Sequence, residues 1–211
     1  MTTPEQKGHV AALAESPERQ GNAEGDDTTV LANALRGGDP AAPAELFDRY
    51  GLFIHRALVR IIGSDDPESS DLLHDTFVRA LQSVGRLKKP EALKSWLHSI
   101  AVFTAKEWLR ARKRMGHPQP PASGPDRPAV SASPEAREAV RALYQVLDTF
   151  PEDERIAFVQ RFVERMDLAT MAEICRVSLS TTRRRIKRAE ARFRKALPAY
   201  PAIEERLRRQ P

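Results

Sequence analysis

Residues 168–195, LATMAEICRVSLSTTRRRIKRAEARFRK, predict two short helices joined by a tight turn. The first helix is expected over residues 168–175 and the second over about 180–197, with the connection at 176–180. Two helices in this arrangement are typical of a DNA-binding helix-turn-helix. Four residues of the second helix recur with the spacing of one helical face and are predicted to pack inward: Thr182, Ile186, Ala189 and Phe193.

The opposite face of the second helix is strongly basic. Residues 181–195 carry eight basic side chains and one acidic one, whereas the whole chain has a net charge of only +5. Arg can pair with guanine, and Ser or Thr can contact a base or a phosphate. A solvated basic helix that touches no nucleic acid is the alternative, but the packed face and the tight turn favour DNA binding. Six residues at the start of the helix are predicted to face the DNA: Ser180, Thr181, Arg183, Arg184, Lys187 and Arg188.

Helical periodicity extends through most of the 211-residue chain, and no alternation typical of strands persists. The fold class is therefore all-α, with two small helical domains, a bundle and a helix-turn-helix, joined by a Pro-rich linker. Further helices are expected over 28–36, 43–62, 67–84, 91–114 and 135–148. The predicted organisation is a disordered acidic tail over 1–26, a helical domain over 27–114, the linker over 115–134, the helix-turn-helix domain over 135–197 and a C-terminal extension over 198–211.

One more helix is expected to begin after residue 149 and to run to about residue 164. Thr149 and Glu152 have the spacing of a capping box, in which the hydroxyl of the first and the carboxylate of the second would satisfy backbone N–H groups.

Several functional classes find no support in the sequence. The five histidines and the single cysteine, Cys175, show no metal-ligand spacing, so neither a metal nor another cofactor is expected. Cys175 is expected to be a small buried side chain. No phosphate-binding Gly loop or nucleophile motif is found, so the chain is predicted not to be an enzyme. An acidic N-terminus and the lack of a long apolar run predict a cytoplasmic protein that does not enter a membrane.

Two segments resemble a known family. Residues 44–114, which contain AELFDRYGLFIHRALVRIIG, SSDLLHDTFVRAL and LKSWLHSIAVFTAKEWLRARKR, resemble region 2 of extracytoplasmic-function (ECF) sigma factors. Residues 141–197, which begin RALYQVLDTFPEDERIAFVQRFV, resemble region 4. The resemblance implies that the chain binds core RNA polymerase and directs it to promoters. Its implied partners are the β′ clamp helices and the β flap of the polymerase, promoter DNA, and an anti-sigma factor as a candidate.

The resemblance also assigns residues to roles. In the family, region 4 reads the −35 element as duplex DNA. The resemblance implies that the six outward residues of the last helix make this contact. The family's polymerase contact falls on Asp71, Leu72, His74 and Asp75. Binding of the melted −10 strand needs positive charge and a flat surface for bases. The resemblance assigns this role to Lys88, Lys89, Lys94, Phe103, Lys106 and Arg110.

Two of these positions depart from the family's pattern. His74 stands where the family usually has Gln, and Phe103 stands where it usually has Asn. Asn can hydrogen-bond a base, whereas Phe can only stack on one or pack in the protein. These departures keep a second interpretation open, in which the chain is a helix-turn-helix regulator with a sigma-like fold that binds DNA or polymerase without melting a promoter.

Overall fold

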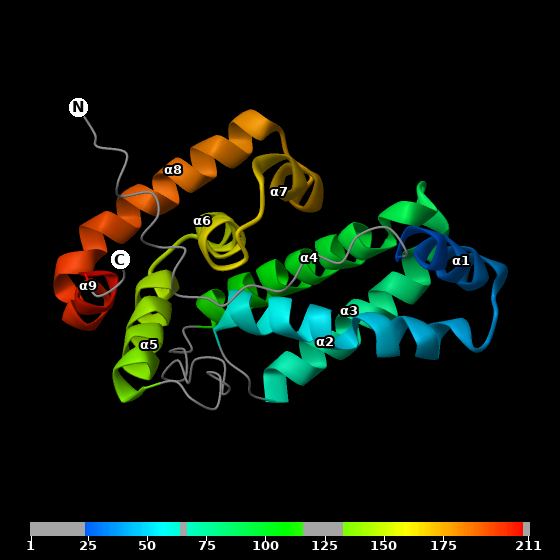
Figure 1. Cartoon of the computed structure of the whole chain (residues 1–211), viewed down its shortest axis with the longest axis horizontal. Helices are drawn as coiled ribbons and strands as arrows, with labels where there is room; N and C mark the ends of the chain where they lie inside the picture. Colours follow the sequence, from blue (N-terminus) through cyan, green and yellow to red (C-terminus); the bar gives the residue numbers. More distant parts are fainter. Residues whose placement is uncertain (1–23, 64–66, 116–132, 209–211) are drawn as a thin grey trace.

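A computed structural model of the chain describes residues 24–63, 67–115 and 133–208, and this part of the chain is helical without strands (Figure 1). The α-helices are α1 (Glu24–Gly37), α2 (Ala42–Ile62), α3 (Pro67–Ser83), α4 (Leu93–Arg114), α5 (Pro134–Asp148), α6 (Glu152–Phe158), α7 (Leu168–Cys175), α8 (Leu179–Ala196) and α9 (Pro201–Arg208). Short 3-10 turns stand at Val84–Arg86, Pro90–Ala92 and Leu197–Ala199, and a π-helical turn, Val159–Val163, continues α6. The all-α fold class is confirmed.

The first domain is a bundle in which α2, α3 and α4 all pack against one another. An apolar stripe of α2 supplies much of its core, because residues spaced by three or four positions lie on one face of a helix. Helix α1 packs across this bundle and reaches the 3-10 turn at Pro90–Ala92. Five residues of the α2 stripe are buried: Leu46, Tyr50, Ile54, Leu58 and Ile61.

The second domain is organised around the ring of Phe158 in α6, which is 1% exposed. Its centroid lies 4.8 Å from that of Phe162, 5.0 Å from that of Phe193 and 6.0 Å from that of Phe150. Tilted and edge-on arrangements at these distances are favourable between aromatic rings. Because Phe193 belongs to α8, this cluster fixes the basic helix to α6.

Helix α4 lies between the two domains. One side packs on α2 and α3, and the other packs on α6 and α7 (Figure 1). The buried apolar residues of both domains consequently form one continuous core. The sequence predicts two domains, and both are present, but they are docked on each other.

The boundaries differ from the predicted ones in several places. Helix α1 begins at Glu24, so the last residues assigned to the acidic tail are helical; residues 1–23 lie outside the described part. Most of the predicted linker, residues 116–132, also lies outside it. The C-terminal extension contains a helix that the sequence analysis missed, α9, whose Ile203 is fully buried and which packs on α5.

The predicted capping box at the start of α6 is wrong. The N-cap is Pro151, which has no side chain able to accept a hydrogen bond. The hydroxyl of Thr149 instead donates to the carbonyl of Val146 at 2.7 Å, within the last turn of α5. Thr149 therefore satisfies the end of the preceding helix rather than the start of the next one.

We predict that Phe158→Ala lowers the free energy of unfolding by about 3–5 kcal/mol, because it leaves a cavity among three rings. Chemical denaturation of the full chain measures this loss. Leu52→Ala is the control, since its side chain is 62% exposed and its removal is expected to cost within about 0.5 kcal/mol. Equal losses for the two variants would contradict the role of the aromatic cluster.

Candidate nucleic-acid and polymerase interface

Helices α7 and α8 form the predicted helix-turn-helix, and side chains cap the start of each helix. The carboxylate of Asp167 accepts a hydrogen bond from the backbone N–H of Thr170 at 3.0 Å. The hydroxyl of Ser178 accepts one from the backbone N–H of Thr181 at 3.2 Å. Between the helices Arg176 adopts the left-handed conformation, with φ of 51°, and this conformation ends α7. The local sequence thus fixes where α8 begins.

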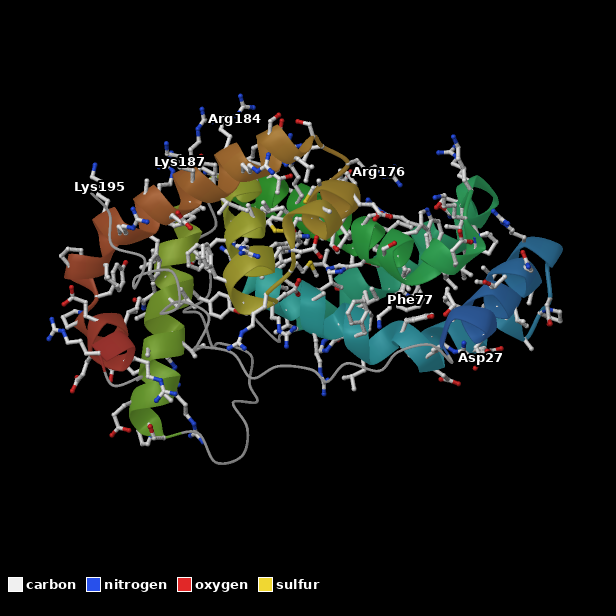
Figure 2. All side chains as sticks on the ribbon, turned by 45° about the horizontal axis from the view of Figure 1, so that its top comes forward. Asp27, Phe77, Arg176, Arg184, Lys187 and Lys195 are labelled. Carbon is white, nitrogen blue, oxygen red and sulfur yellow. The ribbon has the colours of Figure 1, made fainter. Side chains whose placement is uncertain are left out.

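Helix α8 has one buried and one exposed face, as predicted. Its four inward residues are buried: Thr182, Ile186, Ala189 and Phe193. Figure 2 shows Arg184, Lys187 and Lys195 extending away from the body of the molecule. Of the six residues predicted to face DNA, Thr181 is half-buried and five are exposed: Ser180, Arg183, Arg184, Lys187 and Arg188.

The basic residues of α8 divide into paired and unpaired groups. Arg185, on the flank of the helix, donates to the carboxylate of Asp153 at 2.9 Å. Arg192, further along the helix, is paired with Glu154. No carboxylate in the described residues is within ion-pair distance of the outermost four: Arg183, Arg184, Lys187 and Arg188. The outer face therefore carries uncompensated positive charge.

The residues predicted for the −10 strand fall into two environments. Four of them are exposed: Lys88, Lys89, Lys94 and Arg110. The other two lie on the side of α4 that faces the second domain. The Lys106 side chain is 16% exposed and forms an ion pair with Asp153. The Phe103 ring is half-buried, and the guanidinium of Arg176 lies over it at 5.7 Å. The structure thus does not bring all six together on one open surface.

Four residues are predicted to contact polymerase, and three of them are exposed along α3: Asp71, His74 and Asp75. The fourth, Leu72, is 6% exposed and belongs to the hydrophobic core. A buried side chain offers no surface to a partner, so Leu72 is corrected to a core residue.

Two apolar side chains that no sequence pattern singled out lie beside this acidic stretch. Phe47 of α2 is 48% exposed, and its ring centroid lies 5.0 Å from that of Phe77, three residues beyond His74 on α3. Leu81, one turn further along α3, is also exposed. Both residues were present in the family-like segments, but only their exposure distinguishes them from core residues.

Other kinds of site find no support in the described residues. No group of three or more His, Cys, Asp or Glu side chains there could hold a metal ion. Cys175 is half-buried, its thiol donates to the amide oxygen of Gln160 at 3.3 Å, and burial raises the pKa of that thiol. None of the described helices is long and apolar enough to span a bilayer.

Comparison with known proteins agrees with this geometry. Residues 46–115, which cover α2 to α4, match the family model for sigma-70 region 2. Residues 140–193, which cover most of α5 to α8, match the model for sigma-70 region 4. Together the two matches account for more than half of the chain.

Relatives match over nearly their whole length. The chain is 30% identical to the RNA polymerase sigma-H factor of Pseudomonas aeruginosa, with 83% of this chain and 95% of that protein covered. It is 29% identical to the ECF RNA polymerase sigma factor SigM of Mycobacterium tuberculosis, with 84% and 87% covered.

A solved structure supports the fold. CnrH, solved in complex with the cytosolic domain of CnrY, superposes with a TM-score of 0.58 at 21% identity, covering 82% of this chain and 97% of CnrH. Two family models in the expected order, full-length relatives and a shared fold all point to one conclusion. The chain belongs to the ECF group of the sigma-70 family, the proteins that direct core RNA polymerase to promoters.

Proposed function

We propose that α8 reads the −35 element as duplex DNA, that α3 docks on core RNA polymerase, and that the exposed basic residues around α4 hold the −10 strand. The observation that carries the proposal is the two-faced α8, whose inner side is packed while its outer side carries unpaired Arg and Lys. A helix of about 12 Å diameter fits the major groove, where base edges can be read. We expect the chain to act in the cytoplasm, where the polymerase works.

The start of α8 is suited to both bases and phosphates. The Ser178 hydroxyl lies 2.9 Å from that of Ser180 and 3.0 Å from that of Thr181, so three hydroxyls cluster at the positive end of the helix. Arg183 and Arg184 follow directly and are exposed. Hydroxyls and backbone N–H groups would fix the helix on phosphate oxygens, and an Arg would then read guanine.

The α3 surface has the composition of a protein interface. Exposed acidic groups at Asp71 and Asp75 lie on the helix that also presents Leu81, and Phe47 from α2 adds an aromatic side chain nearby. An apolar centre with a charged rim is typical of a specific contact. We propose that this surface binds the β′ clamp helices, and that the second domain contacts the β flap.

An anti-sigma factor is a further candidate partner. CnrH, whose fold this chain shares, was solved in complex with the cytosolic domain of CnrY. The rival interpretation is a regulator that binds DNA or polymerase without melting a promoter. It is not favoured, because the chain matches RNA polymerase sigma factors over most of their length. We expect the protein to act by binding alone, without a reaction of its own.

Transcription in vitro tests the proposal as a whole. With core polymerase and genomic fragments, we expect start sites that appear only when this protein is added. Polymerase that binds the protein but forms no open complex on any fragment would contradict the proposal and restore the rival.

We predict that Arg184→Ala weakens binding to a promoter fragment found in this way by about 1–3 kcal/mol and changes its base preference, because a base contact is lost. Lys195→Ala is expected to weaken binding to all DNA alike and to lower the salt dependence by about one counterion, as loss of a phosphate contact does. Fluorescence anisotropy at several salt concentrations measures both. Identical effects of the two variants on every sequence would refute this division.

We predict that Asp75→Arg weakens binding to core polymerase by at least about tenfold, since it reverses a charge at the proposed interface. Glu91→Arg makes the same charge change at an exposed position outside α3 and is expected to bind polymerase like the wild type. Titration of labelled protein with core polymerase measures the affinities. Normal binding by Asp75→Arg would remove α3 from the polymerase interface.

A further inference from the structure

The first residue of α8, Leu179, is an apolar side chain in a polar setting. It is 42% exposed, and among the described side chains of the second domain no other large apolar one is exposed. Its neighbours Ser178 and Ser180 are exposed as well. Figure 1 shows the start of α8 at an outer edge of the molecule. Leu179 therefore lies directly before the residues proposed to contact the −35 duplex, without a charge or a hydroxyl of its own.

The turn between α7 and α8 does not need Leu179. When a helix ends in a left-handed residue, an apolar side chain just after it often packs back on the last turns of that helix. Here Arg176 is the left-handed residue, and the backbone N–H of Val177 donates to the carbonyl of Ala172 at 3.0 Å. Val177 is half-buried, so it supplies this apolar contact. Leu179 is thus left outside the packing of the turn.

The rotation of α8 about its axis determines where Leu179 points. Thr182 is 3% exposed, and its hydroxyl donates to the carbonyl of Ser178 at 3.2 Å, which fixes the first turn. Successive residues of a helix are about 100° apart, so Leu179 stands on the flank between buried Thr182 and exposed Arg183. Because the Cα–Cβ bonds of a helix tilt towards its N-terminus, the Leu179 side chain extends past the start of α8. Recognition helices place this end against base edges in the major groove.

Exposure alone would not single out Leu179, because isolated apolar side chains are common on protein surfaces. Leu52 of α2 is more exposed, at 62%, and lies outside every surface proposed to bind nucleic acid. What distinguishes Leu179 is its place, directly after the N-cap Ser178 of the helix whose outer face is basic. An apolar group within a charged surface is typical of a contact from which water is excluded.

The chemistry of the major groove offers an exposed apolar side chain one specific partner. The base edges there present hydrogen-bond donors and acceptors, and the C5 methyl group of thymine is the apolar group among them. The residues already assigned to the duplex carry hydroxyls or positive charge, which suit phosphates and guanine. Thr181 also has a methyl group, but that residue is half-buried. Leu179 is therefore the side chain at this end of α8 that can distinguish thymine.

We propose that Leu179 is a specificity-determining residue, which packs against the C5 methyl group of one thymine in the −35 element. The inference rests on the function proposed above, because it requires α8 to lie in the major groove. It adds an apolar contact to the guanine and phosphate contacts of that proposal. The −35 element accordingly contains a thymine, on either strand, where the start of α8 meets the bases.

Duplexes that lack a single methyl group test this contact. Deoxyuridine replaces each thymidine in turn, on both strands of the −35 part of a promoter fragment found by transcription in vitro. Uracil differs from thymine only by the C5 methyl group, and fluorescence anisotropy of the full chain measures each affinity. We expect one position at which the substitution lowers the affinity of the wild-type protein about fourfold, the effect of one buried methyl group.

Leu179→Ala separates this contact from the others. The variant is expected to bind the unmodified duplex about fourfold more weakly than the wild type and to lose the preference for thymine over uracil at that position. Leu179→Met is expected to keep most of the preference, because methionine offers a similar apolar surface. The preference is expected to be equal at low and high salt, whereas the overall affinity falls with salt.

Two controls distinguish the ways in which the test can fail. Leu52→Ala removes an exposed leucine of the first domain and is expected to keep the thymine preference of the wild type. Arg184→Ala is expected to weaken binding yet keep that preference, since it removes a different base contact.

A wild-type protein that binds no −35 duplex would overturn both the proposed function and this inference. The assignment of Leu179 alone is overturned if the wild type binds and Arg184→Ala weakens binding as predicted, but no uracil substitution changes the affinity. Retention of the thymine preference by Leu179→Ala would overturn it equally.

Discussion

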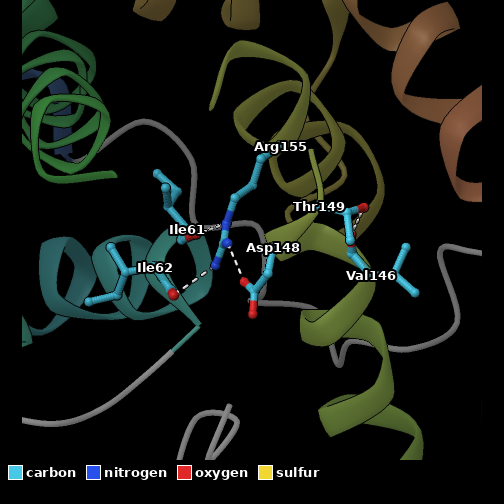
Figure 3. Close-up of polar contacts among 6 residues, drawn as sticks. All are labelled: Ile61, Ile62, Val146, Asp148, Thr149 and Arg155. Atoms are coloured by element: carbon cyan, nitrogen blue, oxygen red, sulfur yellow. Dashed lines mark hydrogen bonds and ion pairs between the residues drawn. The ribbon is translucent and has the colours of Figure 1, made fainter. Parts of the chain in front are cut away.

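The arrangement of the two domains depends on the buried guanidinium of Arg155. A charged group in the interior is stable only when its donors are satisfied, and here two carbonyls of α2 and the carboxylate of Asp148 satisfy them. Burial disfavours the charged form and lowers the pKa of Arg155, while Asp148 opposes that shift. Because the carbonyls come from one domain and the arginine from the other, separation would leave both sides to water. The docked arrangement therefore depends on these three bonds (Figure 3).

This junction explains why basic residues that look alike in the sequence differ in their surroundings. Arg185 and Lys106 share the carboxylate of Asp153 and are occupied in the docked state. Arg184, one residue away from Arg185, is exposed and extends away from the body of the molecule (Figure 2). Helical geometry places successive residues about 100° apart, so one run of arginines serves both the junction and the DNA-facing surface. The same helix thus contributes to the DNA-facing surface and to the domain junction.

Much of the fold follows from the sequence, because apolar periodicity depends only on local spacing. The stripe of Thr182, Ile186, Ala189 and Phe193 and the limits of α7 were predicted correctly. The capping box predicted at Thr149 was wrong. That pattern considers only the backbone N–H groups of the following helix, whereas the Thr149 hydroxyl donates to the Val146 carbonyl of the preceding one. Leu72 shows a further limit: a family motif assigns a role to a segment, whereas burial decides which side chains of that segment can touch a partner. The contact between Arg155 and Ile61 joins residues far apart in the chain, and no local pattern predicts it.

The side-chain Nε–H of Arg155 reports the contact between the two domains most directly. Nuclear magnetic resonance on the full chain can follow its hydrogen exchange before and after core polymerase is added. In the free protein we predict exchange much slower than that of exposed arginines such as Arg184, because the proton is buried and bonded to the Ile61 carbonyl. Binding of core polymerase is expected to remove this protection. Fast exchange in the free protein, or unchanged protection in the polymerase complex, would contradict the account.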